Sequence, residues 1–437
     1  MKAGALKGTI KVPGDKSLSH RALMLAAMTV GETRIEGLLK GEDVMATADA
    51  LRGLGVEIVQ DNQGFWRVQG VGVGGLAEPD QPLDLGNAGT GVRLLMGLLA
   101  GHPFTTFLTG DASLRKRPMA RVTKPLAEMG AISLARSGDR LPLAITGSNN
   151  LIPISYNQPV ASAQVKSALL LAGLHAPGET TVIEPSRSRD HTERMLTFLG
   201  ANVETEALPD GRSKVTVTGQ PELSARDLSV PGDPSSAAFL LAAAALCPGS
   251  ALRIENVGLN PLRTGFLRCL EEMGAKLTSG NGGLVAGEPV SWLDIQHGPL
   301  QAIDVPASRA PSMIDEYPIL AVVASMANGV TRMEGLGELR VKESDRLKVM
   351  ADGLTAAGIR VEMGQDSLAV EGRGAAPSGG VSIDAVHDHR IAMSFLVLGA
   401  IADRPIEIRG AETIETSFPG FKDLMNNLGA NLDEVNS

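Results

Sequence analysis

Positively charged side chains stand at the start of several apolar, helix-like segments, where a cation is not expected. Lys16 and Arg21 open one such segment, Arg93 lies near the start of another, and Arg390 opens a third. The N-terminus of a helix is the positive end of its dipole, so a nearby cation costs about 0.3–1 kcal/mol unless an anion offsets it. Four such placements indicate that these segments bind a molecule with several negative charges.

Other polar side chains share these helix starts, and some of them have a simpler interpretation. The remaining members of the clusters are Ser17, Asn87, Thr90, Ser162, Gln164, Lys166, Asp233, Ser235, Asp315, Glu316, Asp388 and His389. For Ser17, Asp233 and Ser235 the alternative is N-capping, in which a side-chain oxygen accepts a hydrogen bond from a backbone N–H of the first turn. The types of residue alone do not decide between a cap and a ligand.

Three further segments concentrate charge. They contain, in order, Arg115, Lys116, Arg117 and Arg121; Arg187, Arg189 and Arg194; and Arg340, Lys342, Arg346 and Lys348. Acidic neighbours leave an alternative open in the last two, because Asp190 and Glu193, or Glu343 and Asp345, can offset the cations on an ordinary solvated helix face. These segments therefore either bind the same anion or form charged surface.

Composition narrows the class of protein. The chain has 437 residues, of which 43% are hydrophobic and 20% charged, as in a globular protein of about two domains. A net charge of −9 argues against nonspecific nucleic-acid binding. No signal peptide and no apolar run of about 20 residues is present, so we expect a cytoplasmic protein that does not enter the membrane. Cys247 and Cys269 lie in apolar surroundings and are predicted to be buried or half-buried thiols rather than part of a disulfide framework.

Two signals repeat six times along the chain. The first is a glycine between an amphipathic stretch and an alternating one, at Gly55, Gly130, Gly200, Gly274, Gly358 and Gly429. It predicts a helix that ends at a left-handed glycine before a strand begins. The second is a strongly apolar helix after a polar cluster, expected at 15–28, 86–101, 162–174, 233–246, 315–329 and 388–401. The two signals interleave, which predicts six α/β repeats of about 70 residues.

The motif VPGD occurs at 12–15 and again at 230–233, each time before a serine-bearing helix start. The copies introduce the first and fourth repeats, so we expect one lobe of residues 15–231 and a second of 1–14 with 232–437. Pro-Gly pairs favour turns, and hinges are expected near both motifs. If the buried helices of both lobes point the same way, their N-termini converge on a cleft suited to anions.

Nine segments occur in an order that spans nearly the whole chain: PGDKSLSHRA, LGNAGTGVR, RKRPM, SAQVKSALLLAGL, SRDHTERM, IDEYPILAV, ELRVKESDRL, DHRIAMSF and TSFPGF. Together they resemble the EPSP synthase family (3-phosphoshikimate 1-carboxyvinyltransferases), and its second subclass in particular. The resemblance implies an α/β fold with two domains, each an inside-out α/β barrel of three βαβαββ repeats.

The same resemblance implies a reaction. The enolpyruvyl group of phosphoenolpyruvate would pass to the 5-hydroxyl of shikimate 3-phosphate through a tetrahedral intermediate, with release of phosphate, as a step of chorismate and aromatic amino-acid biosynthesis. Both substrates are anions, as the cationic helix starts require. The chemistry needs no metal or organic cofactor, and we expect a monomer with no nucleic-acid or membrane partner.

The resemblance also implies roles for individual residues. Asp315 would be the general base, Glu343 the proton donor to carbon, and Lys16 a group that can protonate the leaving phosphate. Shikimate 3-phosphate would be bound by Lys16, Ser17, Arg21, Ser162, Ala163, Gln164, Arg189, Asp315 and Lys342. Phosphoenolpyruvate would be bound by Lys16, Asn87, Gly89, Arg117, Gln164, Arg346, His389 and Arg390.

The chain departs from the best-known pattern of the family at three positions. Ala163 replaces a second serine, Glu338 stands where an asparagine ligand is found, and Thr416 occupies the position of a lysine that binds phosphoenolpyruvate. Lys166 and Arg189 match the second subclass, but each is either a ligand or a structural charge. The response to glyphosate therefore stays open.

Two rival functions remain. A UDP-N-acetylglucosamine enolpyruvyl transferase would share the fold, but that family has a loop cysteine where this chain has Ala112. A noncatalytic anion-binding protein would keep the arginines but would need neither Asp315 nor Glu343.

Overall fold

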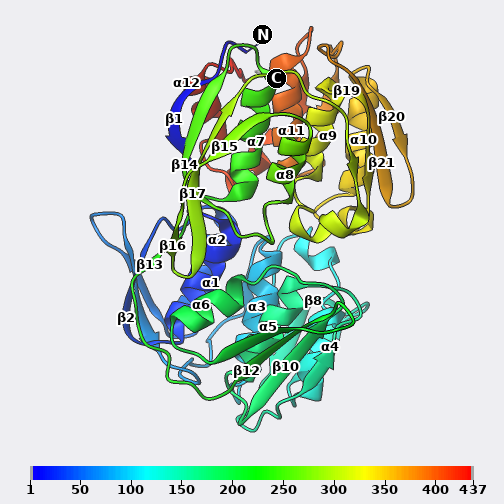
Figure 1. The fold of residues 1–437 in the computed structure, drawn as a ribbon. Coiled ribbons are helices and arrows are strands. Elements are labelled where there is room, and N and C mark those ends of the chain that lie inside the picture. The colour runs from blue at the N-terminus through cyan, green and yellow to red at the C-terminus, as the bar shows by residue number, and fades with distance from the viewer. Residues whose placement is uncertain (1–2, 435–437) are drawn as a thin grey trace. The chain divides into compact units, whose positions relative to one another are not determined.

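The computed structural model describes residues 3–434, and these group into two lobes (Figure 1). The first lobe consists of Lys16–Val230 and Leu284–Glu288. The second lobe consists of Met1–Asp15, Pro231–Gly283 and Pro289–Ser437. Residues 1–2 and 435–437, which the sequence assigns to the second lobe, lie outside the described residues.

The observed division differs from the expected one in two details. The chain crosses between lobes after Asp15 and after Val230, within one residue of each expected boundary. The short segment Leu284–Glu288 groups with the first lobe, whereas the sequence assigns it to the second. Its local contacts explain the difference, because Arg194 donates a hydrogen bond to the carbonyl of Gly287 at 3.2 Å and His191 lies 2.7 Å from a carboxylate oxygen of Glu288.

The first lobe contains three buried helices, three amphipathic helices and three four-stranded sheets. The buried helices are α1 (Lys16–Ala27), α3 (Gly89–Leu99) and α5 (Ala163–Gly173), and the amphipathic ones are α2 (Glu42–Gly53), α4 (Ala120–Glu128) and α6 (His191–Phe198). In spatial order the sheets are β13 (Leu228–Ser229), β2 (Val30–Glu36), β4 (Trp66–Val71) and β3 (Glu57–Gln60); β5 (Leu83–Asp84), β6 (Thr105–Thr109), β8 (Arg140–Thr146) and β7 (Ile132–Arg136); and β9 (Ser155–Asn157), β10 (Glu179–Glu184), β12 (Ser213–Thr218) and β11 (Val203–Ala207).

The second lobe has the same alternation of buried and amphipathic helices, but within the described residues its sheets have five, four and two strands. Its buried helices are α7 (Pro234–Leu246), α9 (Tyr317–Met326) and α11 (His389–Ile401), and the amphipathic ones are α8 (Gly265–Glu272), α10 (Arg346–Ala356) and α12 (Phe421–Leu428). Its sheets are β1 (Lys7–Lys11), β14 (Ala251–Gly258), β17 (Glu288–Gln296) and β15 (Lys276–Ser279), with β16 (Gly283–Val285) beside β17; β18 (Asp304–Val305), β19 (Asn328–Glu334), β21 (Ser367–Arg373) and β20 (Arg360–Met363); and β22 (Ser382–Asp384) with β23 (Glu407–Arg409).

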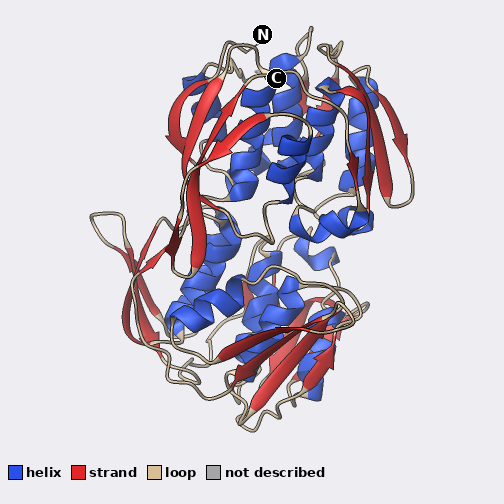
Figure 2. Cartoon of the chain, in the orientation of Figure 1, coloured by secondary structure: helices blue, strands red, loops and turns tan. Residues whose placement is uncertain are grey.

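In each lobe the helices form the interior and the strands lie on the outside (Figure 2). The buried helices are mostly apolar, although α1 and α5 also bury Arg21 and Lys166, and α7 has thirteen residues that are all buried. A helix of this kind has to be enclosed, because leaving its side chains in water forfeits about 25 cal/mol per Å² of apolar surface. The predicted α/β fold of two inside-out barrels with three repeats each is therefore confirmed.

The six repeated glycines end the six amphipathic helices, as predicted. Their φ angles lie between 86° and 111°, in the left-handed region. A side chain at such a position is strained, which is why glycine recurs there. Five of these glycines let the chain turn from a surface helix directly into an outer strand, whereas the strand expected after Gly429 is absent from the described residues 430–434.

The lobes exchange one strand each, and this explains the two VPGD motifs. In an ordinary repeat the strand before a buried helix pairs in parallel with the strand after it, as β5 does with β6. In contrast, β1 precedes α1 but pairs with β14, and β13 precedes α7 but pairs with β2. Each VPGD follows an exchanged strand, so it marks a place where the chain leaves one lobe for the other.

Each lobe has its own apolar core, and both cysteines lie in the core of the second lobe. Cys247 and Cys269 are free, buried thiols, as the sequence predicts, and burial raises the pKa of Cys247 to about 11. No helix within residues 3–434 is both long and apolar enough to cross a membrane.

Two histidines in the first lobe make its stability sensitive to acid. The rings of His102 and His175 lie 5.0 Å apart, and Nε2 of His175 is buried with no hydrogen-bond partner among the described residues. Burial, with a smaller contribution from His102, lowers the pKa of His175 to about 3. Between pH 6.5 and 3 the unfolded chain therefore binds a proton at His175 that the folded chain does not, so folding is weakened as the pH falls.

We expect His175→Gln to flatten the dependence of the urea midpoint on pH between pH 6.5 and 4.5. The control is His387→Gln, because His387 is exposed. Equal slopes for the wild type and His175→Gln would contradict this assignment.

Candidate active site

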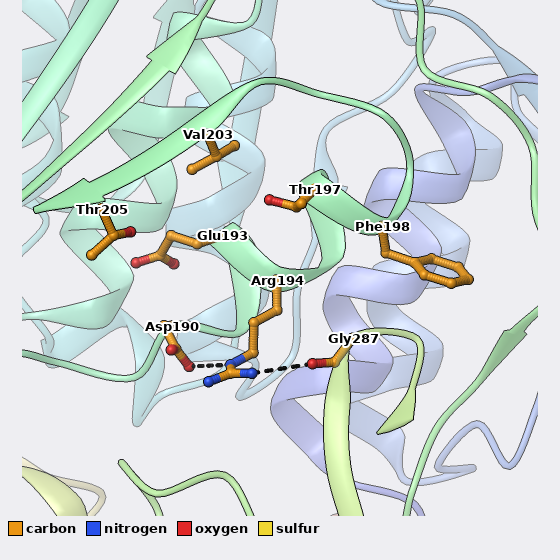
Figure 3. A pocket seen from close by; sticks show the side chains of 8 residues that line it. All are labelled: Asp190, Glu193, Arg194, Thr197, Phe198, Val203, Thr205 and Gly287. Atoms are coloured by element: carbon orange, nitrogen blue, oxygen red, sulfur yellow. Dashed lines mark hydrogen bonds and ion pairs between the residues drawn. The ribbon is translucent and has the colours of Figure 1, made fainter. Parts of the chain in front are cut away.

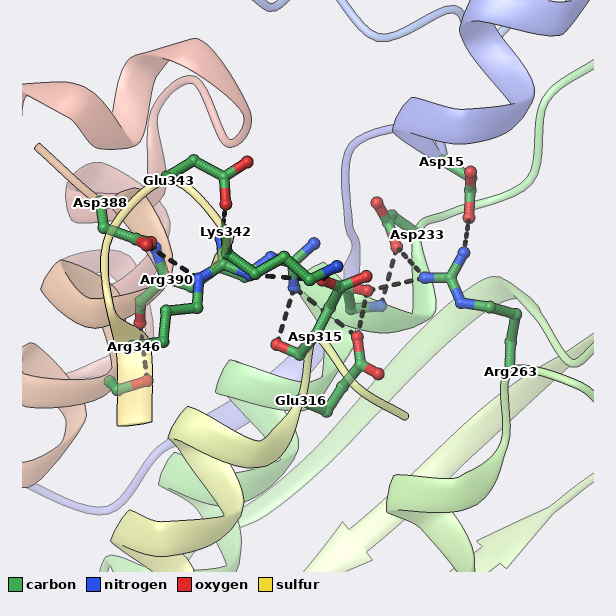
Figure 4. Close-up of polar contacts among 12 residues, drawn as sticks. Asp15, Asp233, Arg263, Asp315, Glu316, Lys342, Glu343, Arg346, Asp388 and Arg390 are labelled. Atoms are coloured by element: carbon green, nitrogen blue, oxygen red, sulfur yellow. Dashed lines mark hydrogen bonds and ion pairs between the residues drawn. The ribbon is translucent and has the colours of Figure 1, made fainter. Parts of the chain in front are cut away.

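Arg346 is the centre of a polar cluster at the starts of α9, α10 and α11 (Figure 4). Its side chain is 1% exposed, and its guanidinium contacts three carboxylates. Nε lies 2.8 Å from Asp388, Nη1 lies 3.3 Å from Asp315, and Nη2 lies 2.5 Å from Glu343. These contacts use three of the five N–H donors of a guanidinium. Arg346 therefore holds three separate segments together. Among the described residues, the other two N–H donors of its guanidinium have no hydrogen-bond acceptor.

The carboxylates keep Arg346 charged. Burial opposes the charge, but Asp388, Glu343 and Asp315 together raise the pKa of Arg346 above its ordinary value. The alternative interpretation, that Arg346 belongs to an ordinary solvated helix face, is therefore wrong. Lys342 lies outside the helix, directly after the 3₁₀ turn Gly337–Val341, and its Nζ is 3.3 Å from Asp315.

Arg390 stands beside the same cluster, in the first turn of α11. Asp388 caps this helix and accepts a hydrogen bond from the backbone N–H of Arg390 at 3.0 Å. Nη1 of Arg390 donates to the carbonyl of Asp315 at 3.2 Å and lies 3.6 Å from Glu316. His389 is the first residue of α11 and is buried. The charge of Arg390 is therefore offset by a neighbouring acidic side chain. The expectation from the sequence that this cation has no acidic partner is wrong.

A second cluster lies at the start of α3 in the first lobe. Arg117 donates to the side chain of Asn87 at 2.5 Å, and Arg93 donates to Gln164 at 3.1 Å. Gly89 begins α3, and a Cβ atom there would lie 2.7 Å from Nη1 of Arg117 and 3.2 Å from Nη1 of Arg93. Only glycine lets the two guanidinium groups approach the backbone this closely. The structure thus brings together four residues that the sequence assigns to phosphoenolpyruvate: Asn87, Gly89, Arg117 and Gln164.

The start of α1 carries the next group. Lys16 forms an ion pair with Asp43 of α2. Arg21 is buried and donates to the carbonyl of Ser17 at 2.9 Å, to Ser167 at 2.8 Å and to Thr192 at 2.8 Å. Arg21 therefore ties α1 to α5 and α6, a structural role that the sequence analysis does not predict.

The residues assigned to shikimate 3-phosphate at α5 are at its first turn. Ser162 caps the helix and accepts from the backbone of Val165 at 3.4 Å, and Ala163 is the first helical residue. Arg189 is half-buried in the loop before α6. Within residues 3–434 no three His, Cys, Asp or Glu side chains are grouped to hold a metal ion.

Lys166 is a structural charge. It is 1% exposed, and its Nζ lies 2.8 Å from Glu184, 2.7 Å from Glu193 and 3.2 Å from the carbonyl of Ser188. Burial opposes the charge, but Glu193 and Glu184 raise the pKa of Lys166. Lys166 donates hydrogen bonds to Glu184 and to the carbonyl of Ser188, and Glu193 completes its surroundings as an ion-pair partner. The sequence leaves open whether Lys166 is a ligand or a structural charge, and these contacts support the structural charge.

A hollow of about 400 Å³ opens beside α6, and Glu193, a partner of this lysine, is one of its lining residues (Figure 3). Arg194 crosses it and bonds to Asp190 at 2.8 Å and to the carbonyl of Gly287 at 3.2 Å. None of the residues that the sequence assigns to either substrate lines this hollow. It is therefore not part of the candidate site.

Sequence reasoning missed Asp388 as a member of the site. In the sequence Asp388 is part of a polar helix start, but its contact with Arg346, 42 residues earlier, has no local signal. An acidic residue at the N-cap of a buried helix is the one available indication. Asp43, the partner of Lys16, was missed for the same reason.

Lys166→Met should destabilise the fold by about 3–5 kcal/mol, because it leaves two buried carboxylates without their cation. The matched control is Lys214→Met, since Lys214 pairs with Glu206 at an exposed position and such pairs contribute about 1 kcal/mol or less. Urea unfolding measures both. A loss no larger for Lys166→Met than for Lys214→Met would contradict the structural role.

Comparison with known proteins identifies relatives over the full length. The family model described as EPSP synthase (3-phosphoshikimate 1-carboxyvinyltransferase) matches residues 1–425. A 3-phosphoshikimate 1-carboxyvinyltransferase of Paramagnetospirillum magneticum is 56% identical over 100% of this chain and 98% of its own length. One of Rhodospirillum rubrum is 57% identical over 97% of this chain and 95% of its own.

Solved structures agree with these matches. The EPSP synthase from Acinetobacter baumannii superposes with a TM-score of 0.88 at 45% identity, covering 98% of this chain and 97% of that one. The enolpyruvyl transferase NikO from Streptomyces tendae has a TM-score of 0.78 at 18% identity, over 98% and 96% of the two chains, which shows a common fold.

Proposed function

The chain belongs to the EPSP synthase (3-phosphoshikimate 1-carboxyvinyltransferase) family, and on this premise we propose that it transfers the enolpyruvyl group of phosphoenolpyruvate to the 5-hydroxyl of shikimate 3-phosphate. The products are 5-enolpyruvylshikimate 3-phosphate and phosphate. The observation that carries the proposal is the cluster around Arg346, where fixed cations stand beside two carboxylates able to exchange protons. This is what an addition and elimination between two anions needs.

The binding roles follow from charge. The phosphate and carboxylate of phosphoenolpyruvate suit guanidinium groups, which bind planar anions through paired N–H donors. We assign the binding of phosphoenolpyruvate to Asn87, Gly89, Arg117, Gln164, Arg346, His389 and Arg390. Shikimate 3-phosphate is assigned to Ser17, Arg21, Ser162, Ala163, Gln164, Arg189, Asp315 and Lys342, mainly in the first lobe. Lys16 serves both substrates.

Two carboxylates supply the proton transfers. Asp315, as a carboxylate, takes the proton of the 5-hydroxyl as that oxygen attacks C2, while Glu343, which has to carry a proton at this stage, gives it to the methylene carbon. The methyl group of the tetrahedral adduct then returns a proton to Glu343, and the C=C bond forms again as the C2–O bond to phosphate breaks. Lys16 protonates the leaving phosphate, and the proton held by Asp315 restores Lys16. Arg346 contacts both carboxylates, at 3.3 Å and 2.5 Å, so one buried cation fixes the acid relative to the base.

A coupled assay separates this proposal from the sister activity. Phosphate release should require phosphoenolpyruvate and shikimate 3-phosphate together. It should not occur when UDP-N-acetylglucosamine replaces shikimate 3-phosphate, because Ala112 stands where that family has its cysteine. Release with the sugar nucleotide alone as acceptor would overturn the assignment.

Asp315→Ala should lower the rate of phosphate release by about 10²–10⁴-fold, the usual contribution of a general base. Binding of shikimate 3-phosphate, measured by calorimetry, should stay within about tenfold. The control is Asp304→Ala, since the side chain of Asp304 is 80% exposed. Undiminished turnover of Asp315→Ala would remove this residue from the mechanism, and it would favour a noncatalytic role for the cluster.

The monomeric state and the cytoplasmic location expected from the sequence are further parts of the proposal. Sedimentation at micromolar concentration should give a mass near 45.5 kDa. A dimer mass would contradict the monomeric state. Recovery of the protein with membranes would contradict the cytoplasmic location.

A further inference from the structure

The two VPGD motifs lie against each other in the second lobe. The backbone N–H of Asp15 donates to the carbonyl of Pro231 at 2.8 Å, and the N–H of Asp233 donates to the carbonyl of Pro13 at 2.9 Å. Gly14 and Gly232 form an antiparallel bridge between these bonds. The two segments at which the chain changes lobes are therefore paired reciprocally.

One buried arginine joins the aspartates of both motifs (Figure 4). Arg263 comes from the loop between β14 and α8, and its side chain is 2% exposed. Nη1 lies 3.1 Å from Asp15 and Nη2 lies 3.3 Å from Asp233. Burial, together with the charge of Asp15, raises the pKa of Asp233, so the aspartates need this cation between them.

The same guanidinium continues toward the candidate site. Nη2 of Arg263 donates to the hydroxyl of Ser235 at 2.7 Å, and that hydroxyl donates to a carboxylate oxygen of Glu316. The same oxygen of Glu316 lies 3.6 Å from Nη1 of Arg390. Glu316 is buried, so its attraction to Arg390 at 3.6 Å is little screened by solvent, and Ser235 orients the carboxylate that exerts it.

We propose that Arg263 is a positioning residue, which acts through Ser235 and Glu316 to hold Arg390 ready for phosphoenolpyruvate while it clasps the two crossing segments. The inference rests on the proposed function, because it takes Arg390 to be a phosphoenolpyruvate ligand. It adds three residues, Arg263, Ser235 and Glu316, that touch no substrate in this scheme. It also gives the paired VPGD motifs a second task beside turning the chain.

The geometry requires an arginine at 263. Its planar fork reaches Asp15 with one nitrogen and both Asp233 and Ser235 with the other. A lysine ammonium is a point charge on a flexible stem and would favour the two carboxylates over the hydroxyl. Ser235 would then be free to turn away from Glu316.

The decisive variant is Ser235→Ala, which removes the connection and leaves the ion pairs of Arg263 in place. We expect the KM for phosphoenolpyruvate to rise about 5–20-fold, while the KM for shikimate 3-phosphate changes less than about twofold. Ser236→Ala is the matched control, because Ser236 is the next residue of α7 and is also buried. It should leave both KM values unchanged.

A purely structural role predicts a different result. Loss of packing or of helix capping lowers the melting temperature or the amount of active enzyme, and it leaves the two KM values alone. An unchanged KM for phosphoenolpyruvate in Ser235→Ala, or an equal rise in Ser236→Ala, would overturn the proposal.

Arg263→Lys provides a second comparison. It keeps the charge beside Asp15 and Asp233, and we expect the same selective rise in the KM for phosphoenolpyruvate. Should this variant fail to fold, the pair of serine variants alone decides the question. The wild type tests the proposed function separately: without phosphate release from the wild type the reaction is wrong, whereas an active wild type with an unaltered Ser235→Ala refutes only the positioning role.

Discussion

Buried cations surrounded by carboxylates from distant parts of the chain fix the geometry of both lobes. Arg346, Arg263 and Lys166 are each almost fully buried, and each contacts at least two acidic side chains. Removing one partner of such a group leaves an uncompensated charge in the interior, which costs several kcal/mol. The segments that carry the carboxylates are therefore held at fixed distances from one another. In the second lobe these segments are the helix starts that carry the candidate catalytic residues.

The repeated architecture explains why so many charged groups gather at helix starts. Each repeat encloses a mostly apolar helix behind an outer sheet, so most of the sides of that helix pack against apolar neighbours. The first turn of that helix remains available to polar groups, and it offers unpaired backbone N–H groups and the positive end of the helix dipole. In the second lobe the acids Asp388 and Asp233 cap such helices and also bind Arg346 and Arg263. One carboxylate thus serves both the helix and the neighbouring guanidinium.

Much of the fold is written in local patterns, and these could be predicted. Glycines such as Gly130 and Gly429 mark helix ends because no other residue suits the left-handed turn, and the all-apolar stretch of α7 can only be an enclosed helix. The nine motifs in order placed the chain in its family. Such features depend on neighbours in sequence.

Long-range pairing could not be predicted in the same way. Arg263 reaches Asp15 across 248 positions, and Arg346 reaches Asp388 across 42. Nothing near these residues in the sequence shows which carboxylate each one meets. The sequence allows two interpretations of Lys166, and only its contacts with Glu184 and Glu193 decide between them. Arg21 joins three helices, although its position in the sequence suggests a ligand alone.

Crystal structures of the protein without ligands and with both substrates would test the central claim most directly. If buried carboxylates fix the cations in advance, Nε of Arg346 stays about 2.8 Å from Asp388 in both structures, and phosphoenolpyruvate contacts Arg346 and Arg390 in the second. A guanidinium of Arg346 that points to solvent until the substrates bind, or phosphoenolpyruvate bound away from both arginines, would contradict it.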